Sequence, residues 1–176
     1  MRQNRIFLIG LPSSGKSKIG SVLAKKMRSN FFDTDELIIQ KCNNEFRSFD
    51  SIQECYALLG EKKFRETEKQ VLEDLLMDDS FEVSIISTGG GIILDSDNRS
   101  LIKNKGIVIF LNTPLETIKE RLKRQNERPI FKGKSIDSRI QELQSERLPF
   151  MKSMADITID IIGSVDEICL LIISKL

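Results

Sequence analysis

The sequence predicts an α/β fold of three layers, in which helices cover both faces of a central parallel sheet of about five strands. Short apolar runs typical of buried strands occur at 5–10, 30–33, 82–88, 106–112 and 156–161. They alternate with longer segments whose apolar residues have helical spacing, which is the pattern of strand–helix–strand units. The 176 residues suit one domain with a sizeable core, so we expect a single domain over 1–176.

Helical patterns fill most of the segments between these strands. The first covers 16–27, where Ile19, Leu23 and Met27 recur at helical spacing. A second begins near Asp35, which can cap the helix or favour its N-terminal dipole. Further helices are expected at about 51–77 with a break near Gly60, at 114–124 behind Pro114, at 135–154 and at 164–176. The polar stretch 125–135 has no apolar period and predicts a mobile loop.

Composition excludes several classes of function. Lys and Arg number 27 against 26 Asp and Glu, so bulk electrostatic binding of nucleic acid is not expected. The absence of histidine excludes histidine-based triads and metal sites, and leaves acid–base work to carboxylates or lysines. Three widely separated cysteines are typical of reduced thiols. The apolar runs are too short for a signal peptide or a membrane span. We therefore expect a cytoplasmic protein with no membrane partner.

A phosphate-binding loop follows the first strand. Residues 10–17, GLPSSGKS, match G-x-x-x-x-G-K-[ST] between a strand and a helix. Gly15 lets the backbone approach phosphate, Lys16 can reach the terminal phosphates, and the Ser17 hydroxyl can bind Mg²⁺. A simple Gly/Ser turn is the alternative. The predicted ATP-binding residues of this segment are Gly10, Pro12, Ser13, Ser14, Gly15, Lys16, Ser17 and Lys18.

Two further motifs are predicted at the same edge of the sheet. Asp-Thr-Asp at 33–35 follows the second strand, and three glycines at 89–91 follow the third. Ligands of parallel sheets bind at the carboxyl ends of the strands, so the three motifs are expected to converge. The third strand does not end in an acid, and Asp33 is therefore the candidate to hold Mg²⁺ through water. A turn or helix cap is the alternative role for Asp33.

These motifs, in their order and spacing, resemble a known family. FFDTDELI, KFRETE, STGGG, ERPI and ERLPF follow the phosphate loop in this order. Together with GLPSSGKS they resemble shikimate kinase, a P-loop kinase fold related to the nucleoside monophosphate kinases, over about residues 5–160. The resemblance implies transfer of phosphate from MgATP to the 3-hydroxyl of shikimate, in aromatic amino acid (chorismate) biosynthesis, by a monomer with a mobile lid.

The resemblance assigns the acceptor site to a segment at about 33–64 and to later motifs. It implies that Arg65 and Arg147 hold the substrate carboxylate, that Glu68 holds the site arginine, and that Asp35 accepts from the reacting hydroxyl. Taken alone, Arg65 and Glu68 also suit an exposed helical ion pair. The remaining predicted acceptor contacts are the backbone of Gly89, Gly90 and Gly91, whose N–H groups are expected to be free to bond the substrate ring, and an apolar wall of Phe64 and Tyr56. Taken alone, the three glycines also suit a flexible turn.

A lid is expected at about 121–134, where the chain is rich in Arg and Lys. By resemblance, Arg128 reaches the transferring phosphoryl group, Arg121 packs on adenine, and Pro129 lines the acceptor side. The alternative is a solvated charged loop. Three stretches depart from the family pattern: Lys18 stands where Thr is usual, Phe150 stands where Tyr is usual, and the lid reads RPIF where RPLL is common. We expect the second change to adjust packing without changing the substrate.

Other functions remain as alternatives at this point. A related small-molecule kinase, for gluconate or a nucleoside monophosphate, would share the phosphate loop, but the DTD and FRETE motifs argue against it. A GTPase-like switch needs an N-K-x-D motif after a late strand, where this chain reads TPLETIK. An inactive, shikimate-binding regulatory domain is the third alternative. The presence of Lys16, Asp35 and Arg128 argues against it.

Overall fold

A computed structural model describes residues 4–46, 48–78, 83–124 and 135–176. Its centre is one parallel sheet, ordered β2-β3-β1-β4-β5. The predicted α/β fold with five parallel strands is confirmed. The strands are β1 (Arg5–Ile9), β2 (Asn30–Asp33), β3 (Ser84–Ser87), β4 (Ile107–Asn112) and β5 (Ile157–Asp160).

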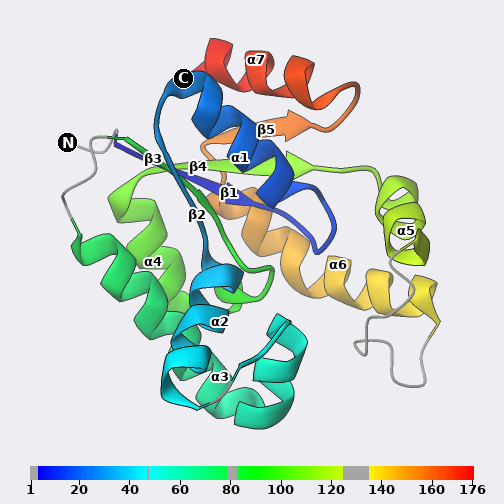
Figure 1. The fold of residues 1–176 in the computed structure, drawn as a ribbon. Coiled ribbons are helices and arrows are strands. Elements are labelled where there is room, and N and C mark those ends of the chain that lie inside the picture. The colour runs from blue at the N-terminus through cyan, green and yellow to red at the C-terminus, as the bar shows by residue number, and fades with distance from the viewer. Residues whose placement is uncertain (1–3, 47, 79–82, 125–134) are drawn as a thin grey trace.

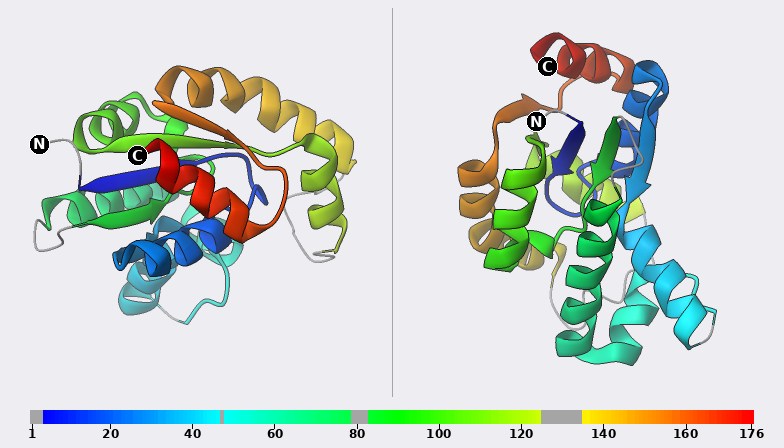
Figure 2. Two further views of the ribbon diagram at one scale, coloured as in Figure 1. Left: turned by 90° about the horizontal axis from the view of Figure 1, so that it is seen from above. Right: turned by 90° about the vertical axis from the view of Figure 1, so that its left-hand side faces the viewer.

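Helices cover both faces of this sheet (Figure 1, Figure 2). The left view of Figure 2 shows α1 and α7 on one face and α4 and α6 on the other. The described helices are α1 (Lys16–Met27), α2 (Thr34–Glu45), α3 (Ile52–Met77), α4 (Ser96–Lys105), α5 (Leu115–Arg124), α6 (Ile136–Met154) and α7 (Val165–Lys175), with a 3-10 turn η1 (Ile92–Leu94).

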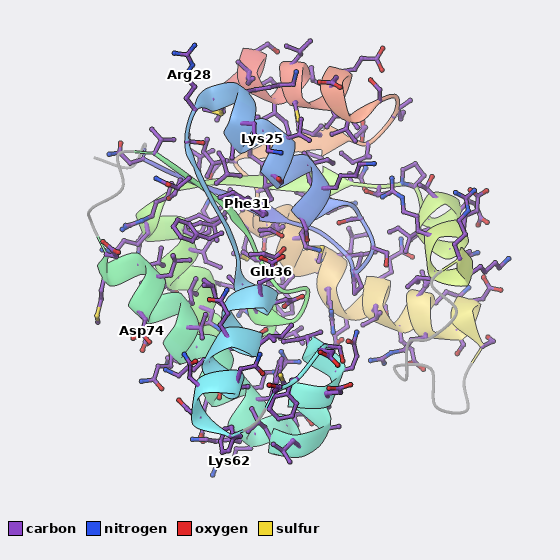
Figure 3. All side chains as sticks on the ribbon, in the orientation of Figure 1. Lys25, Arg28, Phe31, Glu36, Lys62 and Asp74 are labelled. Atoms are coloured by element: carbon purple, nitrogen blue, oxygen red, sulfur yellow. The ribbon has the colours of Figure 1, made fainter. Side chains whose placement is uncertain are left out.

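The core lies in two apolar layers, one on each side of the sheet. Along β1, Ile6 and Leu8 belong to the layer shared with α1 and α7, whereas Phe7 and Ile9 belong to the layer shared with α3, α4 and α6. Both faces of the strand are therefore buried, which is why its sequence is continuously apolar and not alternating. Figure 3 shows Phe31 beneath α1 and the charged side chains of Lys25 and Arg28 at the surface.

Helices α2 and α3 also form a unit with a third apolar cluster between them, although the end of α3 belongs to the core layer of the sheet. The predicted break in α3 is confirmed at Gly60, whose backbone has φ 70° and ψ 168°. The three cysteines are free and buried, as expected for reduced thiols. Cys55 of this unit lies beside Cys42, and burial together with that neighbour raises the pKa of its thiol to about 12. A thiol in this environment is a poor nucleophile.

Two local expectations need correction. Asp33 and not Asp35 caps α2, since an Asp33 Oδ1 oxygen accepts the backbone N–H of Asp35 at 3.0 Å. The sequence reading also missed α4, which carries few apolar residues and is marked chiefly by its cap Asp95. The predicted loop 125–135 lies outside the described residues except for its last position. Among the helices that the structure describes, none is long and apolar enough to cross a membrane.

Candidate active site

A cleft of about 780 Å³ opens at the carboxyl ends of the central strands. The elements that follow β1, β2 and β3 meet there, as the parallel topology requires. It is bounded further by the starts of α3, α5 and α7 and by a side chain from α6. Eleven of the predicted site residues line it: Pro12, Ser13, Gly15, Lys16, Ser17, Lys18, Asp33, Asp35, Gly90, Arg121 and Arg147.

The side chain of Lys16 folds back onto the phosphate loop and bonds to its backbone. The Lys16 Nζ donates to the carbonyl oxygens of Gly10 at 2.9 Å and Leu11 at 3.0 Å, and the side chain is almost fully buried. Lys16 is also the first residue of α1, so the ammonium group and the helix N-terminus face the same cleft. Both supply positive potential to a phosphate group.

Two predicted members of the loop lie behind its surface. Ser14 is fully buried, and its backbone carbonyl accepts from the Thr113 hydroxyl at 3.0 Å. Gly10 is also buried and its carbonyl accepts from Lys16. Neither residue lines the cleft among the described residues, so their contact with ATP stays a prediction. Arg121 does reach the loop, because its Nη1 donates to the Ser13 carbonyl at 3.0 Å.

Asp33 and Ser17 suit a magnesium ion that is shared with nucleotide phosphates. Both line the cleft, Asp33 from the end of β2 and Ser17 from the first turn of α1. The described residues contain no cluster of three or more acids, cysteines or histidines able to hold a metal. Mg²⁺ commonly binds through one or two protein oxygens, water and phosphate. These two oxygen donors therefore fit Mg²⁺. Asp33 also caps α2, which is the role predicted from the sequence as the alternative to metal binding.

The glycine loop after β3 packs against the acceptor-side groups one after another. A Cβ on Gly89 would lie 2.5 Å from Asp35 Oδ1, and a Cβ on Gly90 would lie 3.1 Å from Arg147 Nη1. A Cβ on Gly91 would collide with the guanidinium of Arg65. The absence of side chains is what lets the loop approach these groups. One expectation is wrong here: the N–H of Gly89 is not free for substrate, since it donates to Thr34 Oγ1 at 2.7 Å.

Arg65, Glu68 and Arg147 form a partly buried charged group with an excess of positive charge. Arg65 Nη1 donates to Glu68 Oε2 at 2.7 Å, and the Glu68 side chain is only 3% exposed. An exposed ion pair is therefore excluded. Burial raises the pKa of Glu68, and the charges of Arg65 and Arg147 oppose that rise. Burial lowers the pKa of the Arg147 guanidinium, whose Nε lies 3.5 Å from Glu146 at the rim. Two guanidinium groups near one buried carboxylate suit an anionic ligand.

The comparison with known proteins agrees with this geometry. A family model described as shikimate kinase matches residues 12–176. The chain belongs to the shikimate kinase family. It is thereby a transferase that phosphorylates shikimate with ATP, and neither a gluconate kinase nor an inactive regulatory domain is favoured.

Individual relatives show how far the family likeness extends. The chain is 34% identical to a shikimate kinase of Legionella pneumophila over 160 residues, which is 91% of this chain and 86% of that protein. A shikimate kinase from Acinetobacter baumannii, solved in complex with shikimate, has a TM-score of 0.83 and 29% identity, covering 98% of this chain and 94% of that one. A gluconokinase from Sinorhizobium meliloti, with a TM-score of 0.57 and 15% identity over 97% and 90% of the two chains, shares the fold alone.

Some predicted shikimate kinase residues stand apart from the cleft. Phe64 is buried in the α2–α3 cluster, and Tyr56 is 40% exposed with its ring edge-on to Phe64 at 5.1 Å between centroids. Arg65 lies beside Phe64, with the guanidinium carbon 5.6 Å from the ring centroid. None of these three lines the cleft among the described residues. Their contact with shikimate stays a prediction, and Arg128 and Pro129 lie outside the described residues.

Phe150, which stands where the family usually has Tyr, packs in the core layer behind the site. The guanidinium carbon of Arg99 lies 4.3 Å from its ring centroid. Arg99 Nη1 also donates to the carbonyls of Ile93 at 2.8 Å and Leu94 at 2.9 Å. The ring therefore links α6 to the turn that follows the glycine loop. The expected packing role fits this contact, which needs no hydroxyl.

Sequence reasoning missed several residues that line the cleft or support it. Ile161, Ile162 and Gly163 follow β5 and line the cleft, and the rule that ligands bind at strand carboxyl ends could have identified them. Thr34 was passed over although it is the centre of the Asp-Thr-Asp motif. Ser87 and Thr88 belong to the STGGG motif but were not singled out as site residues. The other lining residues had no local signal of a site in the sequence, namely Ile19, Ile52, Gln53, Pro114, Thr117, Val165 and Ile168.

Proposed function

We propose that this cleft transfers the γ-phosphoryl group of ATP to the 3-hydroxyl of shikimate, giving shikimate 3-phosphate for aromatic amino acid biosynthesis. The observation that carries the assignment of roles is that Lys16, Asp35 and Arg147 line the same cleft. A phosphate-binding cation, a carboxylate and a carboxylate-binding cation thereby face one volume. Donor and acceptor bound in that volume would gain the rate advantage of proximity.

On the nucleotide side, the proposed work is positioning and charge stabilisation. Lys16 exchanges its two loop carbonyls for oxygens of the β- and γ-phosphates. The backbone at the start of α1 supplies further N–H donors to the same phosphates. Arg121, already held at Ser13, is placed to contact adenine. Arg128, in the proposed lid at 121–134, carries the family role of stabilising charge on the transferring group.

Magnesium is proposed as the cofactor, held by Ser17 and by Asp33 through water. When bound, Mg²⁺ offsets charge on the phosphate oxygens. The cap at Asp33 fixes the carboxylate, because one of its oxygens already accepts from the backbone at the start of α2. Ser17 is fixed in a different way, by its place in the first turn of α1.

On the acceptor side, the proposed segment 33–64 and the later motifs orient shikimate. Arg65 and Arg147 bind the carboxylate, and the buried Glu68 keeps Arg65 in place through its 2.7 Å contact. Asp35 accepts the proton of the 3-hydroxyl or aligns that hydroxyl with the γ-phosphate. Gly90 brings the backbone close to the ring. Phe64, Tyr56 and Pro129 complete the proposed apolar wall.

We expect the enzyme to act as a monomer, as its resemblance to the shikimate kinase family implies. We also expect it to work in the cytoplasm, where ATP is available and free thiols such as Cys42, Cys55 and Cys169 stay reduced.

The test is ADP release from MgATP with no acceptor, with shikimate, and with gluconate, measured for the wild type and for Asp35→Asn. We expect release to depend on shikimate alone and to fall by roughly 10²- to 10⁴-fold in the variant. The variant should still bind MgADP, because Asp35 belongs to α2 and not to the phosphate loop.

Two outcomes would contradict the proposal. Release indifferent to shikimate would remove the acceptor assignment and leave only a nucleotide-binding loop. Full activity of Asp35→Asn would remove the role of Asp35 while leaving the reaction in place. Phosphorus NMR of the product, which distinguishes the phosphorylated hydroxyl, tests the position of transfer.

A further inference from the structure

The connections that follow β2 and β3 leave the sheet side by side. The two strands are paired in parallel, and the last pair of their ladder is Asp33 opposite Ser87. Beyond this pair, β2 continues directly into α2 at Thr34, and β3 continues into the glycine loop. The ladder therefore no longer fixes the distance between them. Yet these connections carry Asp35 and Gly90, which both line the cleft.

The side chain of Thr34 joins the two connections. The backbone N–H of Gly89 donates to Thr34 Oγ1 at 2.7 Å. Thr34 is fully buried, with 0% of its surface exposed, so water cannot take the place of its hydroxyl. Buried backbone N–H groups are almost always paired, and an unpaired one is costly. The Thr34 hydroxyl is thus what allows the glycine loop to lie where it does.

This hydrogen bond determines the position of more than one functional group. Gly89 lies directly against Asp35, the residue that follows Thr34, with no room for a Cβ between them. Along the same loop, Gly90 faces Arg147 and Gly91 faces Arg65. A shift of the loop at Gly89 would therefore move the backbone relative to the carboxylate and to both guanidinium groups.

We propose that Thr34 is a positioning residue for phosphoryl transfer: it holds the glycine loop against Asp35 so that the acceptor hydroxyl meets the carboxylate in a reactive geometry. Thr34 is absent from the described lining of the cleft, and it acts through Gly89 and Asp35. This inference rests on the proposed function, because it concerns the acceptor hydroxyl of that reaction.

The hydrogen bond from Gly89 also explains why position 34 is a threonine. Valine has nearly the same shape as threonine but no acceptor, so Thr34→Val would leave the Gly89 N–H buried and unpaired. Serine keeps the acceptor but lacks the second branch at Cβ that restricts χ1. Thr34→Ser should therefore keep the hydrogen bond and hold the loop less firmly.

The experiment compares kcat and KM for shikimate, and the Kd for MgADP, in wild type, Thr34→Val and Thr34→Ser. The control is Thr67→Val, since Thr67 is also buried but its hydroxyl donates within its own helix, to Lys63 at 3.0 Å. We expect kcat/KM for shikimate to fall roughly 10- to 100-fold in Thr34→Val. Thr34→Ser should lose less than about fivefold, and the control less than about twofold. The Kd for MgADP should be unchanged in all variants.

Amide hydrogen exchange at Gly89 shows whether loss of the hydrogen bond to Thr34 is the cause of a lower kcat/KM. The Gly89 amide should be protected in wild type and in Thr34→Ser, and should exchange faster in Thr34→Val. Unchanged kcat/KM in Thr34→Val, equal losses in both Thr34 variants, or an equal loss of MgADP affinity would each overturn the inference. If Thr34→Val does not fold, the proposal is tested with Thr34→Ser alone. A large loss of activity in Thr34→Ser while the Gly89 amide stays protected would contradict the proposal. Failure of the wild type to use shikimate would instead contradict the proposed function.

Discussion

The two halves of the cleft are built in different ways. The phosphate half comes from one continuous segment, residues 10–18, in which Lys16 bonds to carbonyls only five and six positions away. The half that we propose for the acceptor is assembled from α2, α3, α6 and the loop after β3, so Asp35, Arg147 and Gly90 come together only in the folded chain, and Arg65 lies against Gly91 outside the described lining. The first half is a local structure and the second depends on tertiary packing.

This difference predicts how each half responds to change. In the phosphate half, hydrogen bonds to backbone atoms hold the functional side chain, and neighbouring side chains matter less. In the acceptor half, two supporting contacts come from other segments: Gly89 donates to Thr34, and Phe150 of α6 packs on Arg99 of α4. Arg65 is held by Glu68, three residues further along the same helix. Substitutions there should mainly affect the use of shikimate, and substitutions in the phosphate loop should mainly affect the chemical step with ATP.

The largest effect is expected for Lys16→Met. Loss of the ammonium removes a charge that faces the transferring phosphates, so kcat should fall about 10³-fold. Shikimate affinity, measured by calorimetry without nucleotide, should change less than about threefold. Lys25→Met is the control, because Lys25 is an exposed residue in the last turn of the same helix and its removal should leave kcat unchanged. A large loss of shikimate affinity in Lys16→Met would show that the halves are not separable.

A smaller effect, confined to the acceptor half, is expected for Gly91→Ala. The backbone there has φ −97° and ψ −13°, which alanine adopts without strain, so the methyl acts only by displacing the Arg65 guanidinium. Loss of one charge-assisted contact to the substrate carboxylate should raise the KM for shikimate roughly tenfold or more. The KM for ATP should stay constant in the same assay. If both KM values rise together, the loop does not belong to the acceptor half alone.

The smallest effect is expected for Glu68→Gln, which tests the electrostatics of the acceptor half. Glutamine keeps an oxygen for Arg65 but not the charge, and the KM for shikimate should rise roughly fivefold. Glu66→Gln, at an exposed position on the same helix, is the control and should leave that KM unchanged.

Glu68 also predicts a pH dependence of stability. Because burial raises its pKa in the folded protein, the folded state binds this proton more tightly than the unfolded chain does. The contribution of Glu68 therefore favours folding most below the ordinary glutamate pKa, and it declines as pH rises toward the raised value. Urea unfolding of wild type and Glu68→Gln across this range should show the stability of wild type falling relative to the variant. A constant difference would contradict the raised pKa.

The sequence predicted the strands and most helices because each carries a strong local signal. Buried strands such as Arg5–Ile9 are continuously apolar, and the break at Gly60 follows from a residue that readily adopts positive φ. Helix α4 was missed because its stability comes from packing of Ile102 and a cap at Asp95, and such a polar segment has little periodicity to detect.

The parts of the candidate site that consecutive residues form could be predicted, and the parts that distant residues form could not be predicted from the residues alone. The phosphate loop could be identified from eight consecutive residues. The acceptor arginines were identified only through the family resemblance, since Arg65 and Glu68 by themselves suit an exposed pair. Burial of Glu68 excludes the exposed ion pair, and burial is a property of the folded chain. The bond between Gly89 and Thr34, 55 residues apart, has no trace in either segment of the sequence.

The order of the strands also fixes the distance between the carboxyl ends of β1 and β2. β3 lies between β1 and β2, and adjacent strands are about 4.8 Å apart, so the ends of β1 and β2 are separated by about 10 Å. The loop after β3 is fastened to both neighbours, since the Thr88 hydroxyl donates to Leu8 of β1 at 3.1 Å and Gly89 donates to Thr34 after β2. The middle strand thus sets the distance between the phosphate-binding loop after β1 and Asp35 after β2, the carboxylate that we propose to orient the acceptor. Were β2 paired directly with β1, half that distance would remain, and a ring and a phosphoryl group in line would not fit between them.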